Sequence, residues 1–287
     1  MSPRIPGIPP CLRYNTRMGQ SDQEILRYSR NILIREIGPV GQEKLFSSSA
    51  LVVGAGGLGS PALLYLAAAG VGRIGILDGD RVDLSNLNRQ VIHGEGSIGK
   101  KKVESAGAAL RAVRSDLTVE EHGEALTAKN AVAMFRRYDV VIDGSDNFPT
   151  KYLCSDAAVL SGVPLVHAGV LRFGGQITTV VPGRGPCLRC LIPEIPPRKD
   201  APTCSEAGIL GAAAGVFGSL QAVEAVKLIT GAGDTLAGRL LSLDTLTGAA
   251  SVLPFPRSPE CPACGEAPRI RIPLRGEEYD LERSCAG

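Results

Sequence analysis

The sequence lacks any uncharged apolar run of the roughly 18 to 20 residues that a membrane-spanning helix requires. The nearest candidate covers residues 208–220 and is followed by Gln221, Glu224 and Lys227 at helical spacing. We interpret it as part of a buried or interface helix from about 208 to 231. Residues 1–20 are rich in proline and contain no continuous apolar stretch, so we expect a disordered tail and no secretory signal. These absences predict a cytoplasmic protein that does not bind a membrane.

The chain also lacks a strong net charge. It has 31 Lys and Arg residues against 29 Asp and Glu, which gives a formal net charge of +2. This balance gives no support for binding nucleic acid or an anionic membrane surface, so any phosphate recognition has to come from local clusters. Histidine is scarce, and His93, His122 and His167 are not paired at metal-ligand spacing. We therefore expect all three to have packing roles.

Eight cysteines are present. Without an export signal they indicate a reducing compartment, where C-x-x-C motifs hold metals more often than they form disulfides. Cys187 and Cys190 form one such motif, and Cys261 and Cys264 form another. Four thiolates match a structural, tetrahedral Zn²⁺ site with sulfur about 2.3 Å from the metal. A redox-active pair and unrelated free thiols are the alternatives, but the presence of two motifs favours zinc. Four protein ligands leave no open position, so the ion is expected to brace the fold and not to catalyse.

Strand patterns alternate with helical patterns along most of the chain. The expected strands lie near residues 50–53, 74–78, 117–121, 139–143, 164–167 and 176–181, and the expected helices near 59–70, 100–114, 127–136 and 150–162. This alternation predicts an α/β fold with a doubly wound, Rossmann-like and largely parallel sheet. Two late strands, near 239–244 and 249–253, are expected to be antiparallel additions to it.

One domain is expected, from residue 21 to residue 265, with a polar tail at 266–287. Residues 182–206 carry six prolines, a C-x-x-C motif and several charges. This composition is typical of a long loop that crosses the domain. We see no internal repeat, no second domain and no appended rhodanese domain.

A glycine-rich turn follows the first expected strand. Gly54, Gly56 and Gly59 form G-x-G-x-x-G, with Gly57 inside the motif, where the strand turns into a helix. Glycine is needed there because the backbone of a tight turn has to approach a phosphate at the helix N-terminus. The turn therefore predicts a nucleotide site.

The residues after the turn indicate which nucleotide is bound. The glycine motif alone suggests a dinucleotide dehydrogenase with Asp78 on the ribose. Residues 80–90, however, are dense in charged and amide side chains, and Lys102 follows them. A nicotinamide has no obvious use for such a cluster, whereas a triphosphate does.

At these residues the chain resembles the MoeB/ThiF family of ubiquitin-activating-enzyme-like adenylyltransferases, and within it the molybdopterin-synthase adenylyltransferase type. The motifs occur in family order over residues 21–265: the glycine loop, DLSNLNRQ, DGSDNFPTKY, RFGGQ, PCLRC, CSEAGILG and CPACG. The resemblance implies ATP-dependent adenylation of the C-terminal glycine of a ubiquitin-fold sulfur carrier ending in Gly-Gly, with release of pyrophosphate. The acyl adenylate would then accept sulfur from a donor, a desulfurase or a rhodanese acting in trans. The product, a thiocarboxylate, would serve molybdenum cofactor, thiamine or related biosynthesis.

The resemblance also implies roles for residues near the glycine loop. Asp78 is expected to hold the ribose of ATP, and Asn86, Arg89 and Lys102 to contact its phosphates. Asp146 is expected to bind Mg²⁺ directly after a strand, where open α/β sheets bind ligands. Taken alone, an aspartate after a strand is more often a helix N-cap, and the phosphate cluster tips the balance towards a ligand.

This region supplies cations and a metal ligand but no catalytic histidine. A terminal carboxylate has a pKa of about 3.3 to 3.7 and is ionised without a base. Positioning and charge neutralisation are therefore expected to carry catalysis. Asp143, which precedes Asp146 in the same segment, is expected either to bind the metal as well or to cap or brace the loop.

Four more residues are assigned by resemblance. Arg30 lies in a segment like the one whose arginine reaches the partner subunit's ATP, which implies a homodimer; a solvated surface role is the alternative. Arg172 and Gln176 in RFGGQ match a segment near the entering tail of the carrier. Cys204 precedes a helix N-terminus, which would lower the pKa of its thiol, and it is expected to take part in sulfur or acyl chemistry unless it is a dispensable thiol.

Three other functions remain open. A tRNA-modifying, ATP-dependent dehydratase of the same superfamily would act on nucleic acid, and the near-neutral charge and the four-cysteine site argue against it. A dinucleotide oxidoreductase would bind a nicotinamide and not ATP. A non-catalytic binding subunit of a heterodimer would not need the full phosphate cluster.

Overall fold

The computed structural model describes residues 22–197, 204–272 and 274–279 of the 287. Within these ranges one eight-stranded sheet has the order β3-β2-β1-β4-β5-β6-β7-β8. The first five strands in this order pair in parallel, and the pairs β5·β6, β6·β7 and β7·β8 are antiparallel. The predicted doubly wound α/β fold with late antiparallel strands is confirmed. The strands are β1 (Ser49–Val53), β2 (Arg73–Leu77), β3 (Thr118–His122), β4 (Val140–Asp143), β5 (Leu165–Leu171), β6 (Gly174–Val180), β7 (Arg239–Asp244) and β8 (Ala249–Pro254).

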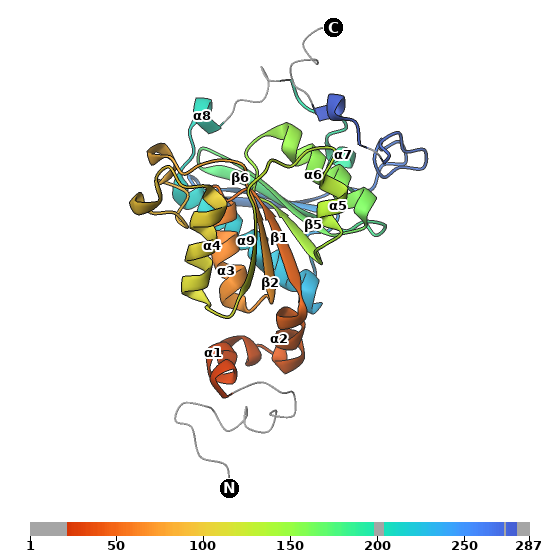
Figure 1. Ribbon diagram of the computed structural model, residues 1–287. Coiled ribbons are helices and arrows are strands. Elements are labelled where there is room, and N and C mark those ends of the chain that lie inside the picture. Colours follow the sequence, from red (N-terminus) through yellow and green to blue (C-terminus); the bar gives the residue numbers. More distant parts are fainter. Residues whose placement is uncertain (1–21, 198–203, 273, 280–287) are drawn as a thin grey trace.

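Helices cover both faces of this sheet (Figure 1). The longer ones are α1 (Asp22–Ile32), α2 (Gly38–Ser47), α3 (Gly59–Ala69), α4 (Lys102–Val113), α5 (Ala131–Phe135), α6 (Phe148–Ser161) and α9 (Gly211–Thr230). Two single turns, α7 (Leu188–Leu191) and α8 (Cys204–Ala207), and the 3₁₀ turns η2 (Leu84–Asn86), η3 (Glu95–Ser97) and η5 (Gly276–Tyr279) complete the described elements. Helices α3, α4 and α9 lie on one face, and α5 and α6 lie on the other.

Alternate residues of β1 contribute to two separate cores. Ala50 and Val52 pack in the core that contains α3, α4 and α9. Leu51 and Val53 pack in the core that contains α5 and α6. Successive side chains of a strand point to opposite faces, and a strand buried on both faces has no polar side. This explains why β1 is a continuous apolar run.

Helix α9 is, by length and composition alone, long and apolar enough to cross a membrane. In the fold it is a core helix, because Phe217, Gln221 and Ala225 are fully buried. Glu224 is also buried, and its Oε2 accepts a hydrogen bond of 2.7 Å from the Thr179 hydroxyl of β6. The expected buried helix near 208–231 is therefore present, packed between α3 and the sheet.

Helices α1 and α2 lie beyond the amino ends of the strands, at the bottom of Figure 1. Tyr28 is buried in an edge-to-face contact with Phe46, with ring centroids 4.9 Å apart. Leu26 and Leu33 on the same segment are 45% and 46% exposed. This end of the molecule therefore presents apolar side chains to the surface, a property that bears on its assembly.

Two segments differ from the sequence-based expectation. The crossing loop carries short helices at α7 and α8, while residues 198–203 and the predicted tail at 1–20 lie outside the described part of the chain. Within the segment after Gly265, which we expected to be a polar tail, Ile270 and Leu274 are buried in the core of α5 and α6. The described part of this segment therefore contributes to the fold.

Candidate active site

A cleft of about 910 Å³ opens at the carboxyl ends of the parallel strands. It is lined by the glycine turn after β1, the end of β2, the segment after β4, and the β5–β6 hairpin. Helix α7 and strand β7 close it on the far side. Ligands of open α/β sheets bind at this end of the strands, so the position agrees with that predicted for a nucleotide.

The glycine turn brings the backbone close to this cleft. Gly54 has a φ of +91°, a conformation that a side chain disfavours. A Cβ at Gly59 would lie 1.8 Å from the Gly54 carbonyl oxygen, so α3 can follow β1 this closely only with glycine. Gly56 and Gly57 line the cleft. In the first turn of α3 the Ser60 N–H already donates to the Gly56 carbonyl at 2.9 Å, so the N–H groups that can face an anionic ligand are those of Gly56 and Gly57 in the loop before it.

Asp78 braces the turn from the end of β2. Its Oδ2 accepts the Ala55 backbone N–H at 2.8 Å, and its Oδ1 accepts the Asp80 N–H at 2.8 Å. Lys102 Nζ lies 3.8 Å from Asp78 and 2.8 Å from the exposed Asp80 carboxylate. The ammonium of Lys102 is thus held in the lining of the cleft by the exposed carboxylate of Asp80.

Arg89 is the second cation of the cleft. Its guanidinium donates to the Ser85 carbonyl at 2.8 Å and to Asn88 Oδ1 at 3.1 Å. It has no carboxylate partner among the described residues, and a triphosphate is the kind of ligand it suits. Asn86 lies in η2, where its amide donates to the Ser85 hydroxyl at 3.2 Å, and it does not line the cleft.

Asp143, at the end of β4, is fully buried and accepts hydrogen bonds at both oxygens. Oδ1 accepts from the Ser145 N–H at 3.0 Å and from the Ser145 hydroxyl at 2.5 Å. Oδ2 lies 2.7 Å from His167 Nδ1 and 3.4 Å from Lys151 Nζ. Burial alone would raise the pKa of Asp143, but the Lys151 charge and the hydrogen bonds from His167 and Ser145 hold it well below its usual range. Asp143 therefore braces the loop, which is one of its two expected roles.

Asp146, three residues further along, is exposed to the cleft. Its nearest described hydrogen-bond partner is the Asn147 amide, at 3.5 Å. Asn147, and not Asp146, is the N-cap of α6, because its Oδ1 accepts the Thr150 N–H at 2.9 Å. The alternative role of Asp146 as a helix cap is thereby excluded, and its carboxylate remains available for a cation.

Two buried residues of the cleft were not predicted from the sequence. His167 was assigned to packing, yet it lines the cleft as the partner of Asp143. Gln90 is 5% exposed, also lines the cleft, and its Oε1 has no hydrogen-bond partner within the described residues. The usable signal for His167 was its place in a strand that pairs in parallel with the strand ending at Asp143. The packing roles of the other histidines are confirmed for His93, which is buried against the Ser105 hydroxyl.

The remaining predicted residues lie at different places. Arg172 and Gln176, in the β5–β6 hairpin, line the cleft. Arg172 has a φ of +56°, and its carbonyl accepts the Leu210 N–H at 3.0 Å. Cys204 begins α8, but its side chain lies outside the described part of the structure.

Arg30 lies on α1 at the amino end of the sheet, beyond the far end of α3. Since α3 has 11 residues, about 16 Å of helix separates the two ends, so Arg30 does not reach the cleft of its own chain.

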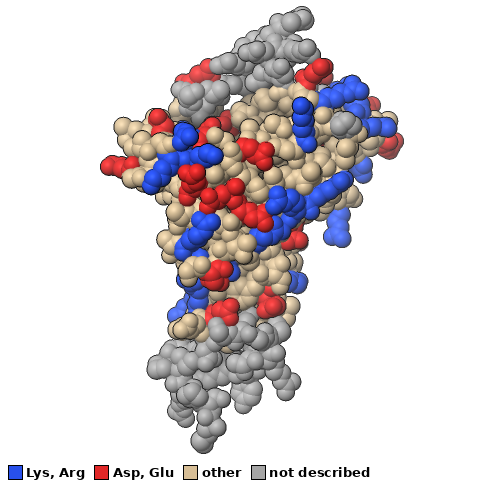
Figure 2. Space-filling model, viewed as in Figure 1, with Lys and Arg blue, Asp and Glu red and all other residues tan. Residues whose placement is uncertain are grey.

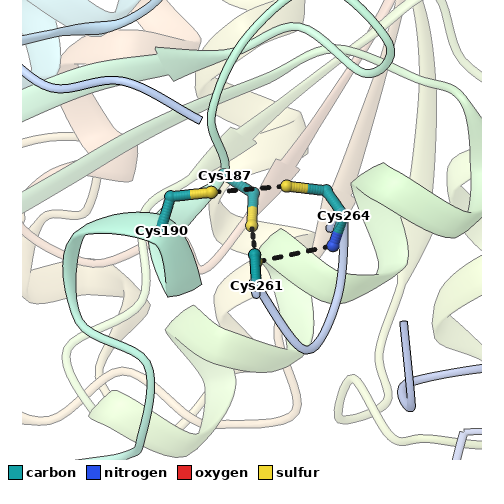
Figure 3. A group of neighbouring side chains, drawn as sticks. All are labelled: Cys187, Cys190, Cys261 and Cys264. Atoms are coloured by element: carbon teal, nitrogen blue, oxygen red, sulfur yellow. Dashed lines mark hydrogen bonds between the residues drawn. The ribbon is translucent and has the colours of Figure 1, made fainter. Parts of the chain in front are cut away.

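The four cysteines converge from two distant segments (Figure 3). Cys187 Sγ lies 3.5 Å from Cys261 Sγ, and Cys190 Sγ lies 3.4 Å from Cys264 Sγ. All four sulfur atoms lie within 4.8 Å of one another. Ligands at about 2.3 Å around a tetrahedral ion would be about 3.8 Å apart, so the residues present fit zinc. Burial, followed by the neighbouring sulfurs, raises the pKa of Cys187, and burial raises that of Cys264 to about 11; a dication would be needed to hold them as thiolates.

A buried ion pair joins this cluster to α6. Arg189, between the first two cysteines, donates three hydrogen bonds of 2.9 to 3.0 Å to the Asp156 carboxylate. The Tyr279 hydroxyl of η5 adds a fourth, at 2.9 Å. On either side of Arg189, Leu188 and Leu191 line the cleft. The short helix α7 and its N-cap thus carry two of the four clustered cysteines and part of the wall of the cleft.

Comparison with known proteins gives a consistent result. The sequence profile of the ThiF family matches residues 28–263. The chain is 49% identical over 266 residues to "Adenylyltransferase and sulfurtransferase MOCS3" of Sus scrofa, covering 92% of this chain and 57% of that protein. It is 45% identical over 260 residues to "SAMP-activating enzyme E1" of Haloferax volcanii, covering 91% of this chain and 94% of that protein. It is 45% identical over 273 residues to "Sulfur carrier protein adenylyltransferase" of Thermus thermophilus, covering 93% and 99%. The chain therefore spans little more than half of the first of these relatives and nearly all of the other two.

Solved structures share the fold at lower identity. E. coli MccB with MccA-N7isoASN superposes with a TM-score of 0.76 at 22% identity, covering 83% of this chain and 74% of that one. E. coli MccB with ATP gives a TM-score of 0.74, also at 22% identity, with the same coverage. At this identity the likeness shows the fold alone.

Proposed function

Because this chain belongs to the ThiF family, we propose that it is an adenylyltransferase that activates the C-terminal glycine of a small, ubiquitin-fold sulfur-carrier protein. The observation that carries the proposal is the set of charged side chains that line the cleft around the glycine turn. Arg89 lacks a carboxylate partner among the described residues, Asp146 is exposed to the cleft, and Lys102 lines it with Asp80 as its ion-pair partner. Three relatives are named as an adenylyltransferase and sulfurtransferase, an activating enzyme E1 and a sulfur carrier protein adenylyltransferase.

The reaction needs positioning and charge neutralisation more than it needs acid–base catalysis. The terminal carboxylate of the carrier is already ionised at neutral pH. One of its oxygens attacks the α-phosphorus of ATP, the bond to the β-phosphate breaks, and pyrophosphate leaves with the bonding electrons. In this proposal Asp78 holds the ribose, while Asn86, Arg89 and Lys102 bind the phosphates. Asp146 would hold Mg²⁺, which neutralises triphosphate charge when it is bound.

The far side of the cleft is suited to a peptide tail. Arg172 and Gln176 line it together with the exposed Phe173. A flexible Gly-Gly tail can pass such a wall because it has no side chains. The activated carrier then accepts sulfur from a donor protein, a desulfurase or a rhodanese in trans, in molybdenum cofactor or related biosynthesis. Cys204 is proposed to act in this later chemistry.

Assembly as a homodimer would complete the site. Arg30 does not reach its own cleft, so a role for it in catalysis requires the partner's cleft. Apolar side chains are exposed on the same part of the surface, among them Leu33, Ile34 and Val40 at 45% to 60%. An interface there would bury these side chains and present Arg30 to the partner subunit.

Zinc is proposed as the structural ion of Cys187, Cys190, Cys261 and Cys264. When bound it would supply the charge that keeps the thiolates ionised and would leave no position open for a substrate. The protein is proposed to act in the cytoplasm, where these thiols stay reduced. Acidic and basic side chains are mixed over the face drawn in Figure 2, and the net charge is +2, which does not favour a nucleic-acid substrate.

The test is carrier-dependent exchange between ATP and radiolabelled pyrophosphate, measured over a panel of purified carriers that end in Gly-Gly. Exchange with at least one carrier, and none when its terminal glycine is removed, is the expected result. ATP consumption that depends on tRNA would indicate the dehydratase of the same superfamily instead. Tight binding of a nicotinamide, or no exchange with any carrier, would overturn the proposed function.

A further inference from the structure

The cleft contains a buried histidine with one ring nitrogen left for a ligand. His167 in β5 lies next to Asp143 in β4, in register, and its Nδ1 is 2.7 Å from Asp143 Oδ2. An ionised carboxylate only accepts hydrogen bonds, so Nδ1 carries the hydrogen. In a neutral ring Nε2 then has a free lone pair. Among the described residues Nε2 has no hydrogen-bond partner, and the ring lines the cleft.

The surroundings of His167 keep the ring neutral. Burial lowers its pKa by more than the neighbouring Asp143 raises it. The charged groups that face it are Asp143 from β4 and Lys151 from α6, and β6 places the non-titrating Thr178 opposite. Lys151 donates to the Ala168 carbonyl at 2.6 Å as well as facing Asp143. An oriented, neutral imidazole backed by a buried carboxylate is the usual form of a general base.

The nucleophile of adenylation is an ionised carboxylate, which carries no proton to remove. The nucleophile of the next step does carry one if it is a thiol, since a free thiol with a pKa of about 8.5 is mostly protonated at pH 7. We propose that His167 is the general base that accepts the proton of a thiol as that thiol attacks the carrier acyl adenylate. This inference rests on the proposed adenylation.

In this step a sulfur–carbon bond forms at the terminal carbonyl carbon of the carrier. The bond from that carbon to the phosphate oxygen breaks, and AMP leaves with the bonding electrons. The thiol proton passes to Nε2, and Asp143 stabilises the imidazolium that results. Asp143 also fixes Ser145, and through it the loop that carries Asp146. Asp143, the last residue of β4, thus fixes both the base, which lies beside it in β5, and the loop that carries the proposed metal ligand.

The test compares His167→Asn with the parent protein, both carrying Cys204→Ser so that Cys204 does not compete with the added thiol. Asparagine can still donate an amide hydrogen to Asp143 from the position of Nδ1, but it has no group at the position of Nε2. Carrier-dependent pyrophosphate exchange should stay within about threefold, because adenylation needs no base. Transfer of the carrier from preformed adenylate to 2-mercaptoethanol, followed as thioester by mass spectrometry, should fall about 100-fold at pH 7.

Two further measurements separate catalysis from structure. With sodium hydrosulfide, which is largely ionised at pH 8, the parent and the variant should react at similar rates. With 2-mercaptoethanol the advantage of the parent should disappear as the pH falls through the pKa of His167, because the protonated ring cannot accept a proton.

The possible results are distinguishable. Equal thiol transfer by parent and variant, or an equal loss with hydrosulfide and 2-mercaptoethanol, would overturn the role of His167 as a base. Exchange lost in a folded variant, as judged by its unfolding curve, would place His167 in adenylation and would also overturn the inference. No exchange by the parent with any carrier would instead remove the proposed function, and the inference with it.

Discussion

The nucleotide end of the cleft and the α6–α7 end are built from similar polar residues but treat them in opposite ways. Around the glycine turn, Arg89 has no carboxylate partner in the described structure, Asp146 is exposed and Gln90 Oε1 is unpaired. Around α7, Asp156 accepts three hydrogen bonds from Arg189 and one from Tyr279. Both ends carry charged side chains, but only around α7 do the charged groups named here have all their partners within the described residues.

This difference separates the polar groups that stabilise the fold from those whose partner would be a ligand. Of the three residues named around the glycine turn, only Gln90 is buried. A buried polar group without a partner costs about 1 to 3 kcal/mol, and a ligand in the cleft can supply the contact that Gln90 Oε1 lacks. A satisfied buried pair fixes its neighbours in place, and here it holds the cysteine turn against α6. Substitutions at the first end should therefore affect activity, and those at the second should affect stability.

The largest effect on activity is expected for Asp146→Ala. Removing the proposed metal ligand should lower carrier-dependent pyrophosphate exchange at least about 100-fold. The free energy of unfolding should change by less than about 0.5 kcal/mol, because the side chain is exposed. Asp234→Ala, at an exposed site away from the cleft, is the matched control. Exchange within about threefold of the parent would remove Asp146 from the active site.

The largest effect on stability is expected at the cysteine end. Cys261→Ser, or removal of zinc by a chelator, should lower the free energy of unfolding by about 3 kcal/mol or more, because metal binding is coupled to folding. ATP binding by the fraction that stays folded should change little. Metal analysis of freshly purified, reduced protein should find one zinc per chain, and its absence would contradict the assignment.

Asp143→Asn tests a residue that shares a property with each end. Both of its carboxylate oxygens have partners within the protein, yet it lies next to the cleft. Leaving Lys151 without its buried counter-charge should cost about 3 kcal/mol of stability. The folded-state pKa of Asp143 is depressed, so its contribution is complete above its unfolded pKa of about 3.9. The contribution is lost as the pH falls below that value towards the folded pKa. Urea unfolding of both proteins from pH 7 to pH 3 should show the difference shrinking, and a constant difference would argue against an ionised Asp143.

Mixing two inactive variants tests whether the nucleotide end is completed by a second subunit. Arg30→Ala and Asp146→Ala chains should each be inactive alone. After subunit exchange, half of the dimers are mixed and each has one intact site, so about a quarter of the parent activity should return. Labelled subunits would show that exchange took place. No recovery after demonstrated exchange would mean that Arg30 does not act across the dimer.

The smallest effect is expected for Cys204→Ser in the adenylation assay. Neither attack by a carboxylate nor release of pyrophosphate uses a thiol, so exchange should stay within about twofold. Any defect should appear in thiocarboxylate formation with a sulfur donor, measured by mass spectrometry of the carrier. Equal thiocarboxylate yield would make the cysteine dispensable, and loss of exchange would refute this division of labour.

The features that the sequence predicted correctly are those with a local cause. The turn at Gly54 and Gly59 follows from close backbone approach within a few residues, and the convergence of the cysteines follows from the metal that four thiolates suit. The strands of the parallel sheet follow from their apolar runs. The turn and the strands need no knowledge of which distant residues meet, and the cysteines, although 74 positions apart, are linked by the number of ligands that one metal ion requires.

The features that were missed depend on register and tertiary packing. His167 and Asp143 are 24 positions apart, and only the pairing of β4 with β5 shows that they touch. The N-cap of α6 is Asn147 and not Asp146, the residue that the sequence analysis weighed as a cap, because the chain enters α6 one residue later. The burial of Ile270 and the bond from Tyr279 to Asp156 likewise depend on where α6 lies, which no local pattern in the C-terminal segment indicates.

The cysteine cluster also acts on the chain before it folds. Cys187 and Cys261 are 74 positions apart, and α9, β7 and β8 all lie between them. An ion that binds both cysteines closes this segment into a loop, and the lost freedom of the unfolded chain corresponds to roughly 4 kcal/mol in the chain-entropy account of cross-links. The closed loop would include β8, whose residues are all exposed at the open edge of the sheet in the folded protein. Loss of the metal would increase the conformational entropy of the unfolded chain. It would thereby lower the free energy of unfolding even if the folded structure hardly changed.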